Sequence, residues 1–420
     1  MSTTQSTATR GSLAVWRNAV FVVFAVSGLG FASWVSRIPA VRDGMDLSTE
    51  TVGLLLFGLA IGSIAGLALA PNYMARVGTR RALLHALLAM AGATALLGFA
   101  AGTVESFALS AATLFLFGFF YSITDVVMNV EGAAVEKAAR RTLLPMMHAY
   151  FSFGTILGAL LGAAAARFQV PIGLHFALAG VAIALAGAVA VRFIPRPDQQ
   201  GPGTTAEPGP AALGATAASP ATGRHGFASR LRETLIMATE PQLLFLGLMV
   251  VGMAFVEGAA NDWLPLAAVD GHGFDNAGGA LVYGTFVAAM TLGRATGGPL
   301  IDRLGRRLTL TLMGSLGFVG IMVFILTNEH WTAFCAAALW GLGGSLGFPV
   351  GVSAAADHPT DAARRVSIVS IFGYTAFLVG PPILGFIGQH LGILDAFYVV
   401  AAMLLVSLLV TPRAMSARAR

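Results

Sequence analysis

The sequence contains few charged residues, one cysteine and one lysine. Only 11% of its 420 residues are charged, against roughly 25% in a soluble domain, while 56% are hydrophobic and the mean hydropathy is +0.78. This balance excludes an ordinary soluble enzyme. Because Cys335 is the only cysteine, the chain can form neither an internal disulfide nor a multi-thiolate metal site.

Several functional motifs are also absent. The sequence has no G-x-x-x-x-G-K-[ST] loop for nucleotide phosphates and no H-E-x-x-H pair for zinc, which argues against an ATP-driven pump and an intramembrane metalloprotease. It also lacks a repeated selectivity-filter signature of the kind found in channels. We therefore predict a protein that is not an enzyme and uses no cofactor or metal ion.

Arginine supplies nearly all of the positive charge, since Lys137 is the only lysine. The formal net charge of +5 and the pI near 9.9 would suggest a nucleic-acid partner for a soluble chain. Here, however, the arginines lie almost wholly between apolar runs, which is the distribution that orients helices in a bilayer. We therefore expect a lipid bilayer around the chain and no nucleic-acid partner.

Long apolar runs, separated by charged residues, glycine and proline, predict an all-α membrane protein with twelve transmembrane helices. The first run lacks a short cleavable apolar region, so we interpret it as a retained helix and not as a signal peptide. The predicted helices cover residues 17–38, 49–71, 82–101, 106–130, 145–166, 172–193, 240–264, 278–300, 308–327, 332–355, 367–389 and 394–411.

The basic residues assign an orientation to these helices. All but four of the 25 lie on one side of the predicted membrane; Arg37, Arg42 and Arg167 lie on the other side, and Arg294 lies within a span. The side rich in basic residues is cytoplasmic. Both termini are therefore predicted to be cytoplasmic, which requires an even number of spans.

A segment rich in proline, glycine, alanine, serine and threonine, residues 194–239, divides the predicted spans six and six. It is typical of a flexible linker, here cytoplasmic. The predicted domains are thus an N-terminal six-helix bundle, residues 1–193, and a C-terminal six-helix bundle, residues 240–420.

The two halves resemble each other in sequence. Arg303 and Gly305 match Arg76 and Gly78 at a constant offset of 227 residues, and Trp34 near the end of the first helix resembles Trp263 near the end of the seventh. Two such repeats, related by an axis along the membrane normal, characterise one class of secondary transporter, with the substrate site between the halves.

The stretch from Gly298 to Arg307 resembles the loop signature of the major facilitator superfamily, G-x-x-x-D-R-x-G-R-R. The resemblance implies the fold of that family, two pseudo-symmetric six-helix bundles, and a loop that latches the cytoplasmic ends of neighbouring helices. In the first half Ala75 and Thr79 replace the aspartate and one arginine of the signature. The predicted gating-loop residues are Gly298, Asp302, Arg303, Gly305, Arg306 and Arg307, with Arg76, Gly78 and Arg80 in the first half.

A narrower set of motifs is similar to those of fucose permease-like proton symporters and related uncharacterised bacterial permeases. It comprises Asp125-x-x-x-Asn129 in the fourth helix, the segment from His148 to Gly154 in the fifth, and Gly347-Phe348-Pro349 in the tenth.

Ionisable residues inside spans are the candidates for proton coupling, because placing a charge there costs at least about 2.5 kcal/mol. Asp125 is the first, and its alternative is a structural carboxylate paired with an arginine or histidine. Glu257 in the seventh helix is the second. Glu131 and His148 lie toward the cytoplasmic side, where His148 could tune the proton affinity of Glu131 or act only in packing.

Polar and aromatic residues near these acids are the candidates for binding substrate. Amide and carboxylate groups accept hydrogen bonds from hydroxyls, and an indole offers a flat apolar face, which suits a sugar-like solute. The alternatives are an interfacial position for the two tryptophans and a solvent-directed Arg37; an inward Arg37 could hold a carboxylate or pair with Asp262. The candidates are Asn129, Asn261, Asp262, Trp263, Trp34 and Arg37.

Together these observations predict a secondary active transporter in a bacterial cytoplasmic membrane, monomeric, that couples protons to the movement of a small polar solute. One alternative is proton-driven efflux of a drug or metabolite, and another is a sensor with the transporter fold and no flux.

Overall fold

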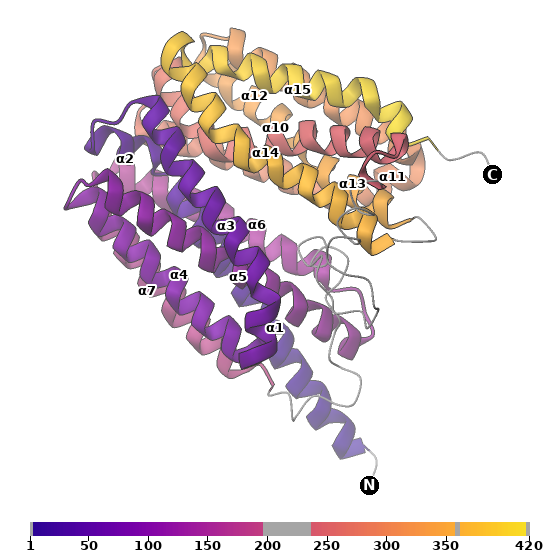
Figure 1. Cartoon of the computed structure of the whole chain (residues 1–420). Helices are drawn as coiled ribbons and strands as arrows, with labels where there is room; N and C mark the ends of the chain where they lie inside the picture. The colour runs from indigo at the N-terminus through magenta and orange to yellow at the C-terminus, as the bar shows by residue number, and fades with distance from the viewer. Residues whose placement is uncertain (1–2, 196–236, 358–361, 417–420) are drawn as a thin grey trace. The chain divides into compact units, whose positions relative to one another are not determined.

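The computed structural model describes residues 3–195, 237–357 and 362–416, and within these every regular element is a helix. Figure 1 shows the path of the chain. The helices are α1 (Thr3–Val35), α2 (Ile38–Gly44), α3 (Thr49–Val77), α4 (Thr79–Gly102), α5 (Phe107–Ala139), α6 (Leu144–Arg167), α7 (Ile172–Arg192), α10 (Pro241–His272), α11 (Asn276–Leu326), α12 (His330–Gly344), α13 (Gly347–Ala356), α14 (Ala362–Leu391) and α15 (Ile393–Ala414).

Eleven stretches of the described chain are long and apolar enough to cross a membrane. One of them, α11, has 51 residues and is interrupted at Gly305, whose φ of 77° and ψ of 158° are not helical. The predicted eighth and ninth spans lie on either side of this glycine, so α11 supplies two crossings. The all-α membrane fold predicted from the sequence is confirmed.

The matching glycine of the first half adopts the same backbone conformation. Gly78 lies between α3 and α4 with φ 81° and ψ 151°. Side chains are excluded from this region of backbone space, so glycine is required at both turns. The repeat inferred from Gly78 and Gly305 is therefore visible in the backbone.

The boundaries differ from the predicted ones in several places. The short helix α2 was not predicted, because its seven residues are too few to show a period. The fourth span was predicted to end near residue 130, whereas α5 continues to Ala139. Residues 196–236, most of the predicted linker, lie outside the described residues.

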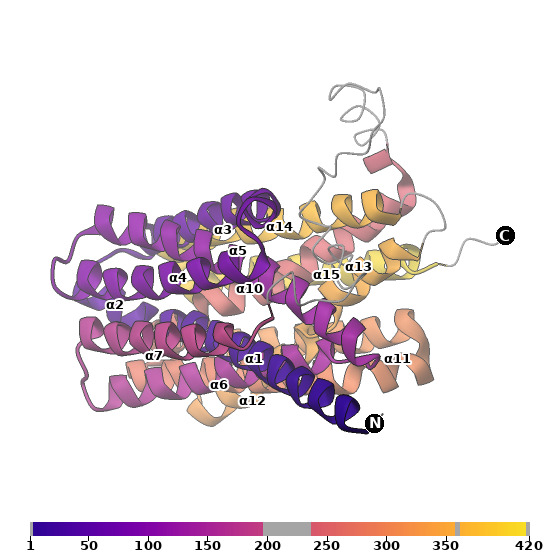
Figure 2. The same cartoon turned by 90° about the horizontal axis from the view of Figure 1, so that it is seen from below.

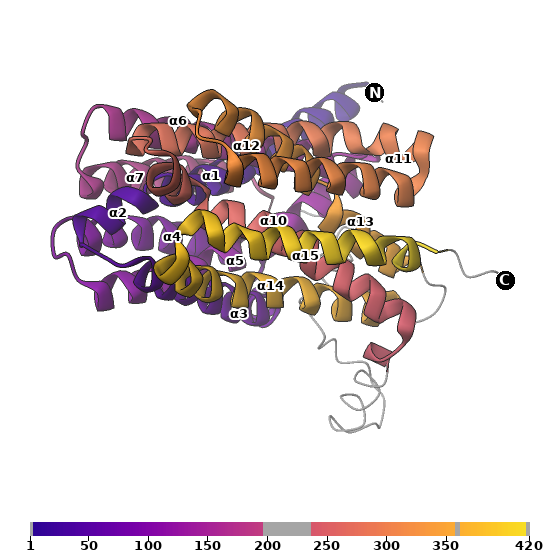
Figure 3. The same cartoon turned by 90° about the horizontal axis from the view of Figure 1, so that it is seen from above.

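The described residues group into two compact units. One holds those within 1–47, 58–209 and 276–284, and the other holds those within 48–57, 210–275 and 285–420. In the first, α1 packs along α6 and α4 along α7, and in the second α10 packs against α14 and α15 (Figures 2 and 3). Each unit has its own apolar cluster of buried side chains.

Small residues allow α6 to approach α1 closely. A Cβ atom on Gly154 would lie 1.9 Å from the carbonyl oxygen of Ala25, and one on Gly162 would lie 1.9 Å from the Ser36 hydroxyl. Close packing through small residues is the usual way in which helices associate in membranes. It fixes the end of α1, and with it Trp34 and Arg37, against the helices that follow.

Candidate functional site

Asp125 and Asn129 lie on one face of α5, as their spacing of four residues predicts. The Asn129 side-chain amide donates to the Asp125 backbone oxygen at 2.9 Å and to its carboxylate Oδ1 at 3.3 Å. Both side chains are partly buried. Within the described chain no arginine, lysine or histidine forms an ion pair with Asp125, so the alternative of a carboxylate paired with a cation is wrong for this structure.

Glu131 lies almost two turns further along α5 and is only 2% exposed. The indole N–H of Trp16 donates to its Oε2 at 3.3 Å, and the hydroxyl of Thr79 also donates to its carboxylate. Both partners are neutral. This carboxyl group is therefore enclosed between α1, α4 and α5 without a cation from the described residues.

The aromatic ring of Phe24 links His148 to the neighbourhood of Glu131. The two rings meet edge to face with centroids 5.3 Å apart, and Phe24 Cε2 lies 3.8 Å from where a Cβ on Gly132 would stand. His148 itself is exposed at the start of α6. His148 therefore lies toward the side of α5 that carries Gly132, the residue after Glu131.

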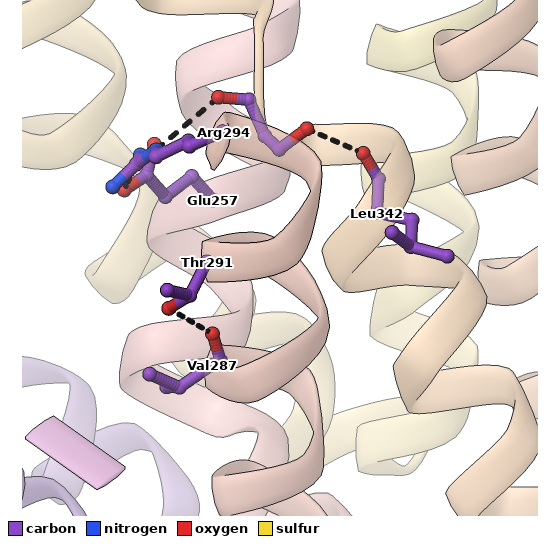
Figure 4. Close-up of polar contacts among 6 residues, drawn as sticks. Glu257, Val287, Thr291, Arg294 and Leu342 are labelled. Carbon is purple, nitrogen blue, oxygen red and sulfur yellow. Dashed lines mark hydrogen bonds and ion pairs between the residues drawn. The ribbon is translucent and has the colours of Figure 1, made fainter. Parts of the chain in front are cut away.

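Glu257 on α10 forms an ion pair with Arg294 on α11, with 2.8 Å between Oε1 and Nη2 (Figure 4). The two side chains are 16% and 35% exposed. Arg294 also donates through Nε to the backbone oxygen of Ser345 at 3.2 Å. Arg294 therefore joins α10 to the break between α12 and α13.

The break explains why Arg294 has a backbone acceptor there. In a continuous helix the Ser345 oxygen would accept from the backbone of residue 349, but that residue is Pro349, which has no N–H. The proline leaves the oxygen free and the guanidinium of Arg294 covers it. Pro349 was noted in the sequence only as part of a family motif, and its spacing from Ser345 is the signal that could have predicted this contact.

Asp262 also lies on α10, five residues beyond Glu257. It is partly buried and has no hydrogen bond or ion pair with any described residue. Its neighbour Asn261 is partly buried and has a polar or ring contact within the protein. Of these two acids on α10, Glu257 is paired and Asp262 has no protein partner among the described residues.

Trp263 and Trp34 are both fully buried, so an interfacial position for them is wrong. The Trp263 ring lies 3.2 Å from where a Cβ on Gly385 would stand, and the Trp34 ring packs against Phe176 with centroids 6.4 Å apart. Neither indole N–H has a hydrogen-bond partner in the described protein. The similar environments agree with the sequence match between the two.

Arg37 is buried as well, which makes the solvent-directed alternative wrong. It is 4% exposed and donates through Nη2 to the Val170 backbone oxygen at 3.0 Å, while Nε and Nη1 have no acceptor. Burial removes water from the guanidinium and lowers its pKa from the usual value. No carboxylate of the described chain forms an ion pair with it.

The gating-loop residues differ between the halves. Arg306 contacts Asp357 in an ion pair and donates to Ser353 Oγ at 3.1 Å, whereas Asp302, Arg303, Arg307 and Gly298 are exposed. In the first half Arg76 is exposed and Arg80 donates to the Val191 and Arg192 backbone oxygens at 3.0 and 3.3 Å. Sequence reasoning missed Trp16 and Thr79 as partners of Glu131, since Trp16 stands in no motif and Thr79 was noted only as a replacement for an arginine of the loop signature.

Three comparisons place the chain among known proteins. It is 27% identical over 392 residues to the uncharacterised transporter y4wD of Sinorhizobium fredii, covering 93% of this chain and 96% of the relative. Its fold matches a bacterial homologue of the human lysosomal transporter Spinster, at a TM-score of 0.74 and 13% identity over 97% and 99% of the two chains. The E. coli fucose:proton symporter FucP matches at 0.62 and 14% over 97% and 100%.

The model of the Major Facilitator Superfamily matches residues 126–329 and 276–419, which together make up more than half of the chain. The resemblance found in the loop signature is thus confirmed by a match that extends well beyond it. The similar relative carries the name of a transporter, and the solved structures share the fold. The chain therefore belongs to the Major Facilitator Superfamily and is a multi-pass membrane transporter, not an enzyme.

Proposed function

We propose that this chain is a monomeric, proton-coupled secondary transporter of a bacterial cytoplasmic membrane. It moves a small polar, sugar-like solute by alternating access of two six-helix halves, residues 1–193 and 240–420, joined by a cytoplasmic linker at 194–239, with both termini cytoplasmic. The observation that carries the proposal is the presence of three acids within spans, Asp125, Glu131 and Asp262, that lack a cationic partner in the described chain.

An unpaired acid in a span favours proton binding, because the bilayer and the packed helices oppose a free charge. Asp125 is the proposed coupling residue. When its carboxylate is charged it accepts the Asn129 amide, and when it is protonated that hydrogen bond weakens and the amide can bind a solute hydroxyl. Proton and solute would then bind to adjacent groups of α5, so that each increases the affinity for the other.

Glu131 and His148 serve in this proposal as a second protonation point near the cytoplasmic end of α5. Glu257, paired with Arg294, takes part only if that ion pair opens. On α10, Asn261 and Asp262 are the proposed solute contacts. Trp34, Trp263 and Arg37 are buried in this structure, and their assignment to the solute site stays a prediction.

Proton movement in proteoliposomes tests the proposal. The purified protein is reconstituted with pH-sensitive dyes on both sides, and sugars, polyols, carboxylates and cationic drugs are added outside one at a time. We expect the outside to become alkaline on addition of one polar, uncharged solute, because protons enter with it. A response of opposite sign to cationic drugs alone would favour efflux, and no response across the panel would contradict proton-coupled transport of these solutes.

A further inference from the structure

The outer end of the first unit concentrates buried polar atoms that have no partner. Nine buried side-chain nitrogen and oxygen atoms of the described chain lack a hydrogen bond, and five of them belong to Ser33, Trp34, Arg37 and His175. All four residues are less than one tenth exposed. Buried polar groups are nearly always satisfied, so a group of this size at one place requires a physical reason.

These residues come from two segments that the fold brings together. Ser33 and Trp34 end α1 and Arg37 follows it, while His175 lies in the first turn of α7. Arg37 bonds to the Val170 oxygen just before that helix, the Trp34 ring packs on Phe176, and the Arg37 charge acts on His175. Ser33 lies in the last turn of α1, and Arg37 lies in the short turn that follows, where its backbone N–H donates to the Trp34 oxygen at 2.9 Å.

The free groups share one chemical character. The Nε and Nη1 groups of Arg37 can only donate, and the hydroxyl of Ser33 and a ring nitrogen of His175 can do so as well. The adjacent helix α7 is preceded by Pro171 and has no side-chain cap, which leaves its positive end open. The acceptor that would satisfy these donors is missing from the described protein.

The second half shows that the fold does not need these polar residues. When Trp34 is matched to Trp263, Leu266 stands at the position of Arg37. When the starts of α7 and α15 are matched at Ile172 and Ile393, Ala396 stands at the position of His175. Leu266 and Ala396 are both fully buried. Apolar residues therefore fill both positions in the second half. Packing does not explain why the first half has an arginine and a histidine there.

We propose that Arg37 and His175, with the Ser33 hydroxyl, bind one small anion, of the size of a halide ion or of the carboxylate group of a short acid. The anion supplies the acceptor and the negative charge that the buried guanidinium lacks. Because the free donors are closed off in this structure, neighbouring side chains must shift to admit the anion, which limits its size. The site lies within the first unit and does not depend on which solute the protein transports.

Thermal unfolding of the full-length protein in detergent tests the site. The unfolding midpoint is measured while sodium gluconate, whose anion is too large for the site, is replaced by sodium chloride, bromide or acetate at constant ionic strength. A bound anion stabilises the folded state by mass action, so we expect a saturable rise of at least about 3 °C. A rise in chloride and bromide alone identifies a halide, and a rise in acetate alone identifies a carboxylate.

Two variants and one direct measurement decide the outcome. Arg37→Leu, which copies Leu266 of the second half, should abolish the rise, whereas Arg167→Leu should retain it because Arg167 is an exposed arginine at the end of α6. Crystals of the unaltered protein grown in the salt that gives the rise should show the anion within about 4 Å of the Arg37 guanidinium, in contact with its N–H groups, with bromide identified by its anomalous scattering. An equal rise in Arg37→Leu, no rise in any salt, or ordered water alone at Arg37 would overturn the proposal.

Discussion

Among the described residues three acids of the second half pair with an arginine, whereas the span acids Asp125 and Glu131 of the first half have none. Glu257 pairs with Arg294, whereas Asp125 has only the amide of Asn129. At the loop signature Arg306 pairs with Asp357, whereas Thr79, at the position of Arg306 in the repeat, donates a hydroxyl to Glu131. The two repeats thus share a backbone and differ in how their carboxylates are neutralised.

The difference teaches that acids within one fold can serve two tasks, depending on whether a cation accompanies them. An acid paired with arginine stays charged and holds helices together, because opening the pair would leave two unpaired charges. An acid held by neutral donors can change its protonation state without breaking an ion pair. We therefore expect changes at the arginine-paired acids to affect stability, and changes at the unpaired acid Asp125 to affect transport.

The largest expected effect is on transport by Asp125→Asn. This change keeps the size of the side chain and removes the group that binds the proton, so uphill accumulation should fall by at least about tenfold. Exchange of labelled for unlabelled solute across proteoliposomes needs no net proton movement and should persist. Glu105→Gln, which neutralises an exposed acid between α4 and α5, is the matched control. Unchanged accumulation in Asp125→Asn would contradict the assignment.

The second prediction concerns the stability of the paired half. Arg294→Ala leaves Glu257 without its cation and the Ser345 oxygen without a donor, and should lower the free energy of unfolding by about 2 kcal/mol, a value reduced because Arg294 is partly exposed. Glu257→Gln should cost less, since its amide oxygen still accepts from Arg294. Chemical denaturation in detergent measures both.

Asp125→Asn provides the contrast for that measurement. Because Asp125 has no cation to lose, its replacement should leave the free energy of unfolding unchanged within about 0.5 kcal/mol. If Asp125→Asn destabilised the protein as much as Arg294→Ala, the proposed division between a structural and a functional acid would fail.

The third prediction tests the enclosure of Glu131. Trp16→Phe removes the indole N–H and leaves part of a buried carboxylate without a donor, which should cost about 1 to 2 kcal/mol of unfolding free energy. Adding Glu131→Gln should recover part of that loss, because a neutral amide needs fewer donors. A Trp16→Phe protein as stable as the unaltered one would show that the 3.3 Å contact contributes little.

Much of this architecture could be predicted from the sequence, because membrane spans and loop signatures are local patterns. The span count followed from apolar runs, and the turn at Gly305 followed from a motif. Contacts between distant residues were harder. Trp16 and Glu131 are 115 residues apart, and no local pattern connects them.

Burial was the other property that the sequence did not reveal. Trp34, Trp263 and Arg37 stand near predicted helix ends, where such residues commonly face the interface, yet all three are enclosed. Their environment depends on how α1 and α10 pack against helices far away in the chain. The glycines of α6 that allow close approach to α1 do not by themselves indicate which side chains that approach buries.

The smallest expected effect is on the exposed ion pair between Arg306, a gating-loop residue of the second half, and Asp357. Asp357 is more than half exposed, so water and salt screen its pair with Arg306. Asp357→Asn should therefore lower the free energy of unfolding by no more than about 1 kcal/mol, and by less at high ionic strength. Thr79→Arg places an arginine at the matching position of the first half, where its partner Glu131 is buried. Transport should therefore fall more in Thr79→Arg than in Asp357→Asn, because the new charge would hold Glu131 ionised. If both variants transported equally well, the arginine of one repeat and the threonine of the other would be interchangeable, and the comparison would carry no functional meaning at this end of the protein.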